Sequence, residues 1–134
     1  MAGDGSLDAN VVLRLLLNDV PEQHAAAVRL VNGAATGFVV SNVAIIEVVF
    51  ALCRHYQFSR DAVVRVLTGL MAQPNITCNR ELLAPTLRLF VAHPKLSFED
   101  CYLATYAELL NSQPLWTFDK KLAVQASSAR LVPM

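Results

Sequence analysis

The chain has 134 residues, 54% of them hydrophobic and 16% charged, and its eleven basic and eleven acidic residues cancel. This length suits one domain over residues 1–134, with residues 1–6 either derived from an expression vector or disordered. The longest charge-free stretch, 30–46, contains too many polar residues and glycines for a membrane span, and no secretory signal is visible. We therefore expect a cytoplasmic protein without a membrane partner.

Short apolar runs typical of β-strands alternate with longer runs of helical periodicity. In chain order, the predicted helices cover residues 10–18, 21–33, 43–56, 60–73, 81–92 and 98–110. The first predicted strand ends at residue 7, and the other four cover residues 38–40, 76–78, 115–117 and 130–132. This alternation predicts an α/β fold in three layers, with a mostly parallel central sheet of four to five short strands flanked by helices.

Several of the predicted helices begin or end at a residue that is typical of a helix boundary. Pro21 suits a first helical turn and Gly33 suits a helix end. Ser59 and Ser97 are expected to cap the helices that follow them. Pro85 either kinks its helix or marks the true first turn.

Glu47 lies inside the apolar run 43–50, where an exposed helix face would carry more than one charge. We therefore predict a nearly buried carboxylate, which needs a partner. An ion pair with Arg54 or Arg14, or simple exposure at the helix edge, would explain Glu47 without a catalytic role.

Three further acids stand where an α/β fold builds sites. Asp8 follows the first predicted strand and Asp119 the fourth, so both lie at the carboxyl ends of strands. Asp100 falls in the first turn of a helix, three residues after Ser97. Each also has a structural explanation, because Asp8 and Asp119 suit helix caps and Asp100 suits a capping box. Together with Glu47, they predict hard oxygen ligands for one or two Mg²⁺ or Mn²⁺ ions.

Such a cluster has a chemical use. Packed carboxylates repel one another, and divalent metal relieves that repulsion. The metal also lowers the pKa of a bound water, places it in line with phosphorus and stabilises the leaving oxygen, so the acids serve as ligands and not as nucleophiles. With four acids around metal, eleven basic and seven acidic residues remain, a surplus that can serve phosphates.

Four motifs resemble those of the PIN-domain family, and particularly those of the VapC toxins of bacterial and archaeal toxin–antitoxin pairs. They are residues 7–14 with Asp8 and Asn10, the helix acid Glu47, residues 97–103 with Asp100, and residues 117–122 with Asp119. The order and spacing match those of the family. The resemblance implies catalytic, metal-binding roles for Asp8, Glu47, Asp100 and Asp119, and supporting roles for Asn10 and Thr117.

The same resemblance implies a metal-dependent endoribonuclease, the toxin of a VapBC-type pair, that hydrolyses RNA phosphodiester bonds with a metal-activated water. It further implies a homodimer that a small antitoxin protein inhibits. Ala9 stands where the family usually has Thr or Ser, and residues 1–6 are polar and glycine-rich where the family has an apolar strand. The alternative is therefore a catalytically weak PIN domain that acts as a dimeric protein-binding module.

Residues beside the fourth motif leave two interpretations open. Lys120 and Lys121 either contact substrate phosphates or form solvated surface. Trp116 either packs in or beside the core or stacks on a base. A phosphatase of the haloacid dehalogenase type is disfavoured, because it would want a second aspartate where Asn10 stands.

Overall fold

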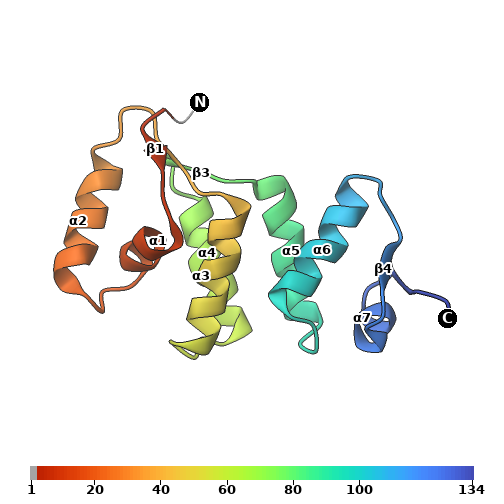
Figure 1. Cartoon of the computed structure of the whole chain (residues 1–134). Coiled ribbons are helices and arrows are strands. Elements are labelled where there is room, and N and C mark those ends of the chain that lie inside the picture. The colour runs from red at the N-terminus through yellow and green to blue at the C-terminus, as the bar shows by residue number, and fades with distance from the viewer. Residues whose placement is uncertain (1–2) are drawn as a thin grey trace. The chain divides into compact units, whose positions relative to one another are not determined.

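The structure, a computed structural model, describes residues 3–134, and the part of the N-terminal prediction that falls on residues 1 and 2 lies outside the described residues. The chain divides into two compact units, Met1–Asn79 and Arg80–Met134 (Figure 1). Within the described residues, no helix is long and apolar enough to cross a membrane. The expectation of one domain over residues 1–134 stays a prediction.

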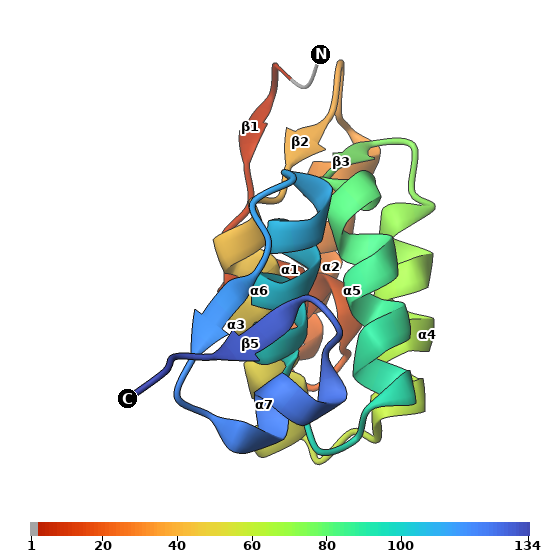
Figure 2. The same ribbon diagram turned by 90° about the vertical axis from the view of Figure 1, so that its right-hand side faces the viewer.

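The first unit alternates short strands with helices. Its elements are β1 (Gly5–Ser6), α1 (Ala9–Leu16), α2 (Pro21–Asn32), β2 (Phe38–Val39), α3 (Asn42–Arg54), α4 (Arg60–Met71) and β3 (Ile76–Thr77). The strands pair in parallel in the order β1-β2-β3 and lie side by side in Figure 2. Helix α1 packs against α2 and α3, while α4 packs against α3 and β3. The carboxyl end of β1 therefore leads into α1, and that of β2 into α3.

The second unit is a helix pair followed by a small parallel sheet. Its elements are α5 (Arg80–Ala92), α6 (Phe98–Leu109), β4 (Leu115–Thr117), α7 (Lys120–Gln125) and β5 (Ala129–Leu131). Helix α5 packs against α6, where Phe90 and Phe98 meet edge to face with ring centroids 5.5 Å apart. Strands β4 and β5 pair in parallel, and α7, which connects them, packs against both.

The α/β fold class predicted from the sequence is confirmed, and each predicted helix and strand is present within a few residues. The pairing of the strands differs from the single central sheet that we expected, because three strands form one sheet and two form another. Periodicity identifies a strand but not its hydrogen-bonding partner. Pro85 lies inside α5, which rules out the first-turn interpretation.

The N-terminal segment is ordered by a polar clamp from Gly3 onward, although disorder is one of the two expectations for residues 1–6. The Asp4 carboxylate accepts the backbone N–H groups of Thr36 and Gly37, both at 2.6 Å. These two hydrogen bonds lower the pKa of Asp4. Gly37 has φ 111°, and an added Cβ would lie 3.0 Å from the Asn75 carbonyl oxygen, so this turn requires glycine. The clamp holds β1, an edge strand of the three-stranded sheet, in register with β2.

Candidate active site

Asp8 caps α1 directly after β1. Its Oδ1 accepts the Val11 backbone N–H at 2.9 Å, and its side chain is exposed. The capping explanation is therefore correct. One oxygen suffices for the cap, so the second carboxylate oxygen can still bind a cation.

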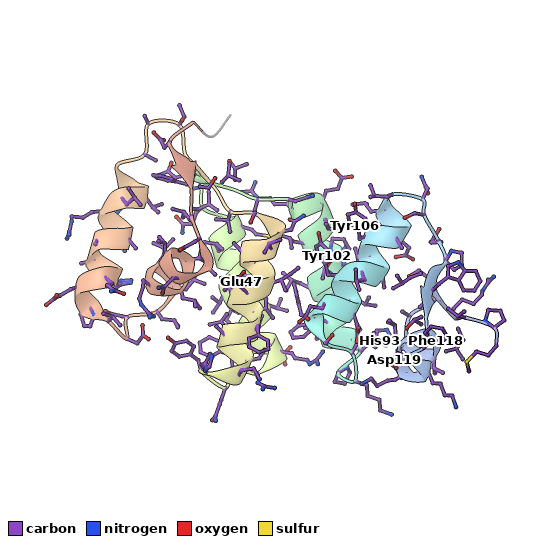
Figure 3. The ribbon with its side chains drawn as sticks, in the orientation of Figure 1. Glu47, His93, Tyr102, Tyr106, Phe118 and Asp119 are labelled. Atoms are coloured by element: carbon purple, nitrogen blue, oxygen red, sulfur yellow. The ribbon has the colours of Figure 1, made fainter. Side chains whose placement is uncertain are left out.

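Glu47 is exposed on α3, so the predicted burial of this carboxylate is wrong (Figure 3). It shares a helix face with Val43, which is 65% exposed, and Phe50, which is 50% exposed. Apolar neighbours usually mark a buried helix face, but these two are exposed. The Arg54 guanidinium lies 5.3 Å from the centre of the Phe50 ring, and Arg14 pairs with another acid. Exposure on the helix is the correct explanation, and it leaves the Glu47 carboxylate open.

Asp100 is half-buried in the first turn of α6. Its backbone N–H donates to the Ser97 Oγ at 3.1 Å, so Ser97 caps the helix as predicted. Among residues 3–134, no hydrogen bond or ion pair engages the Asp100 carboxylate. The capping box is thus only half formed, and the Asp100 side chain is not used for folding this turn.

Asp119 caps α7 directly after β4. Its Oδ1 accepts the backbone N–H groups of Lys121 at 2.9 Å and Leu122 at 3.2 Å. The Thr117 Oγ1 in turn accepts the Asp119 backbone N–H at 2.9 Å. Thr117 therefore fixes the backbone of Asp119, which is the kind of contact expected of a supporting residue.

Asn10 lies in the first turn of α1 and lines a groove of about 350 Å³ between α1 and α2. Asp8 is at the same groove. The remaining lining residues are Val11, Arg14, Gln23, Ala26, Ala27 and Leu30. Asp8 at the N-cap of α1 and Asn10 in its first turn thus share one concave surface.

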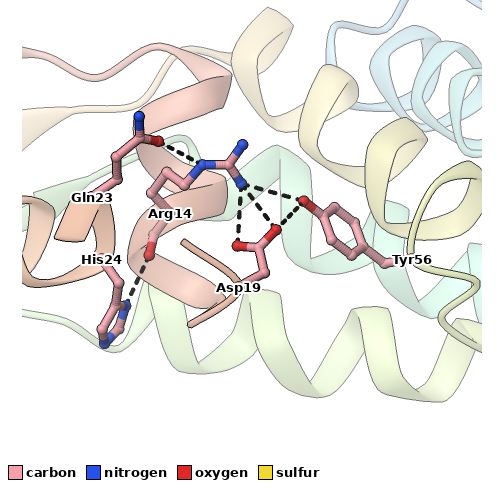
Figure 4. A network of polar contacts seen from close by, with 5 residues as sticks. All are labelled: Arg14, Asp19, Gln23, His24 and Tyr56. Carbon is pink, nitrogen blue, oxygen red and sulfur yellow. Dashed lines mark hydrogen bonds and ion pairs between the residues drawn. The ribbon is translucent and has the colours of Figure 1, made fainter. Parts of the chain in front are cut away.

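A network of polar contacts fixes the guanidinium group of Arg14, which lines this groove (Figure 4). The Arg14 Nη1 lies 3.2 Å from the Asp19 Oδ1, and its Nε donates to the Gln23 side chain at 2.9 Å. The Tyr56 hydroxyl donates to the Asp19 Oδ2 at 2.6 Å. That hydrogen bond, followed by the charge of Arg14, lowers the pKa of Asp19. Arg14 is thus committed to Asp19 and does not pair with Glu47.

The four predicted acids supply the right donor chemistry for a hard divalent cation, because each presents at least one carboxylate oxygen without a partner among residues 3–134. Asp8 and Glu47 belong to the first unit, while Asp100 and Asp119 belong to the second. Across residues 3–134, no group of three or more His, Cys, Asp or Glu side chains is close enough to hold a metal ion. The four-acid site itself stays a prediction.

Each of the two units combines helices with parallel strands, and each carries one acid just after a strand and another on a helix. The family model described as PIN domain matches residues 6–127, a range that contains all four acids. The chain therefore belongs to the PIN domain family. PIN domains are generally nucleases and typically use divalent metal ions. No curated protein matches the chain in sequence.

The structure also shows two polar arrangements that our sequence analysis did not predict. One is the Asp4 clamp, and the other is the network of Asp19, Tyr56 and Arg14. Arg14 within an apolar run and Asp19 five residues later are a recognisable signal for the ion pair. The contribution of Tyr56 has no such signal, because Tyr56 lies just after the end of α3 and is distant from Arg14 and Asp19 in sequence.

Proposed function

We propose that the protein is a metal-dependent endoribonuclease of the VapC type, and that Asp8, Glu47, Asp100 and Asp119 hold its Mg²⁺ or Mn²⁺. Membership of the PIN domain family supports this most directly, together with the presence of all four motif acids in the matched range. The open carboxylate oxygens on these acids are the second support. None of the four is consumed by an ion pair within the described part of the chain.

The proposed site residues have different roles. A divalent ion bound by the carboxylates would supply an activated water and positive charge for the leaving oxygen. Asp8 and Asp119 each use one oxygen for a helix cap, which fixes the orientation of the other oxygen. Thr117 holds the backbone of Asp119. These contacts preorganise ligands before a cation binds, and preorganisation raises affinity and rate.

A homodimer and a small antitoxin are the proposed protein partners. Leu103 and Tyr106 on α6 and Leu110 at its C-cap are between 45% and 55% exposed, which supports an apolar interface. The groove that contains Asp8 and Asn10 supports an inhibitor that reaches the site. We further propose that the protein acts in the cytoplasm.

The test is cleavage of end-labelled RNA by the purified protein. We expect products in Mn²⁺ or Mg²⁺, none in excess chelator, and recovery when metal is added back. Gel electrophoresis of the products measures all three arms. Cleavage that persists at full rate in chelator would overturn the metal-dependent mechanism.

The alternative, a catalytically weak protein-binding PIN domain, is favoured by Ala9, which has no hydroxyl group beside Asp8. A folded protein that cleaves no RNA under any metal condition would support this second function.

A further inference from the structure

Two exposed aromatic side chains beside Asp119 are not explained by folding. Trp116 is 52% exposed and Phe118 is 69% exposed, although large aromatic side chains are usually well buried. They alternate with Leu115 and Thr117, which are half-buried. Trp116 lies on β4 and Phe118 is the first residue after that strand, so the two exposed rings lie two residues apart in the chain, immediately before Asp119. Figure 3 shows Phe118 together with Asp119 at this end of the chain.

Three basic residues lie close to these rings, one in the register of the sheet and two along the chain. Arg130 is the partner of Trp116 in the parallel register of β4 and β5, and it is exposed. Lys120 and Lys121 follow Asp119 and are exposed as well. Residues 112–134 thus contain three basic residues and one acidic residue, although the whole chain is neutral. No ion pair with another described residue engages any of the three cations, so they remain available to phosphates.

We propose that Trp116 and Phe118 stack on unpaired bases of single-stranded RNA, while Lys120, Lys121 and Arg130 contact its phosphates. This inference rests on the proposed nuclease function and names the form of its substrate. Every base has a flat face, so aromatic stacking beside a basic surface binds single strands with little sequence preference. Bases within a duplex are already stacked on each other and are unavailable to the rings. A strand held by Phe118 and Lys120 passes Asp119, the candidate metal ligand that lies between them in sequence.

A protein partner is the competing occupant of this surface. An apolar protein interface is depleted of lysine at its centre, whereas a polyanion is attracted by it. The three cations beside the rings therefore favour RNA. The experiment below treats the protein partner as one of its outcomes.

Trp116 is the only tryptophan of the chain, so its fluorescence reports on this surface alone. Titration with an oligouridylate of about a dozen nucleotides, in chelator to prevent cleavage, should quench that fluorescence. A duplex of the same length should quench it weakly. Phe118→Ala should lower the affinity for the single strand about tenfold, and Phe118→Tyr should restore it. Replacing Lys120 and Lys121 by Ala should lower the slope of log affinity against log salt by about 0.7 per lysine.

Three outcomes would overturn the proposal. The first is no quenching by the single strand, and the second is unchanged affinity in both Phe118→Ala and Phe118→Leu with native circular dichroism. The third is altered sedimentation of the Phe118 variants with unchanged RNA affinity, which would assign the surface to a protein partner. The cleavage assay is independent of this titration. Quenching without cleavage would contradict only the proposed nuclease function. Cleavage without quenching would contradict only the proposed stacking surface.

Discussion

Asp100→Asn should lower the rate of RNA cleavage on the order of a thousandfold while leaving the protein folded. Loss of a residue that merely orients a metal ligand typically costs 10–100-fold, and loss of a ligand should cost more. The Asp100 carboxylate makes no hydrogen bond or ion pair with the described residues, so folding does not depend on it. Asparagine keeps the size of the side chain and the backbone contact with Ser97. Single-turnover cleavage kinetics measure the effect.

Glu99→Gln is the matched control for this variant. Glu99 is exposed in the same turn of α6 and loses the same charge, but it is not one of the four motif acids. We expect its cleavage rate to stay within a few-fold of the native rate, because a surface charge contributes little to catalysis at a distance. Equal cleavage rates for Asp100→Asn and the native protein would show that Asp100 does not belong to the site.

Thr117→Val should lower the cleavage rate by roughly 10–100-fold. Valine has nearly the shape of threonine but no acceptor for the Asp119 backbone N–H, which Thr117 Oγ1 holds at 2.9 Å. A less constrained Asp119 orients its carboxylate less well, so the affinity for Mn²⁺ should fall together with the rate. The change should therefore appear at low Mn²⁺ and diminish as Mn²⁺ approaches saturation.

Thr117→Ser separates positioning from packing. Serine keeps the hydroxyl group and loses only a methyl group from a half-buried side chain. Its Mn²⁺ dependence should match that of the native protein, even if its melting temperature is slightly lower. If serine and valine have the same effect on Mn²⁺ affinity, Thr117 contributes packing and not orientation.

Much of this fold follows from the sequence because its local signals agree. Ser59 and Ser97 cap their helices, and Pro21 opens α2, as predicted. The pairing of strands depends on contacts between distant residues, which a local pattern does not encode. The Asp4 clamp shows the same limit, because its partners lie more than thirty residues away in sequence.

The sequence predicts the positions of the four acids better than it predicts their burial and contacts. Asp8 and Asp119 occupy the strand ends where the sequence places them. Glu47 is exposed and not buried as its apolar run predicts, because Val43 and Phe50 lie on the same exposed face. Periodicity assumes that apolar side chains face the core, and a face that contacts other molecules violates that assumption.

The most direct test of the central claim, that the four carboxylates hold a divalent cation, is calorimetric titration of the folded protein with Mn²⁺. We predict saturable binding of one or two ions per chain, with affinity lowered at least about tenfold in Glu47→Gln. Glu47 is exposed, so this substitution should leave circular dichroism unchanged. A folded native protein that shows no Mn²⁺ binding, or a Glu47→Gln variant that binds Mn²⁺ as tightly as the native protein, would contradict the account.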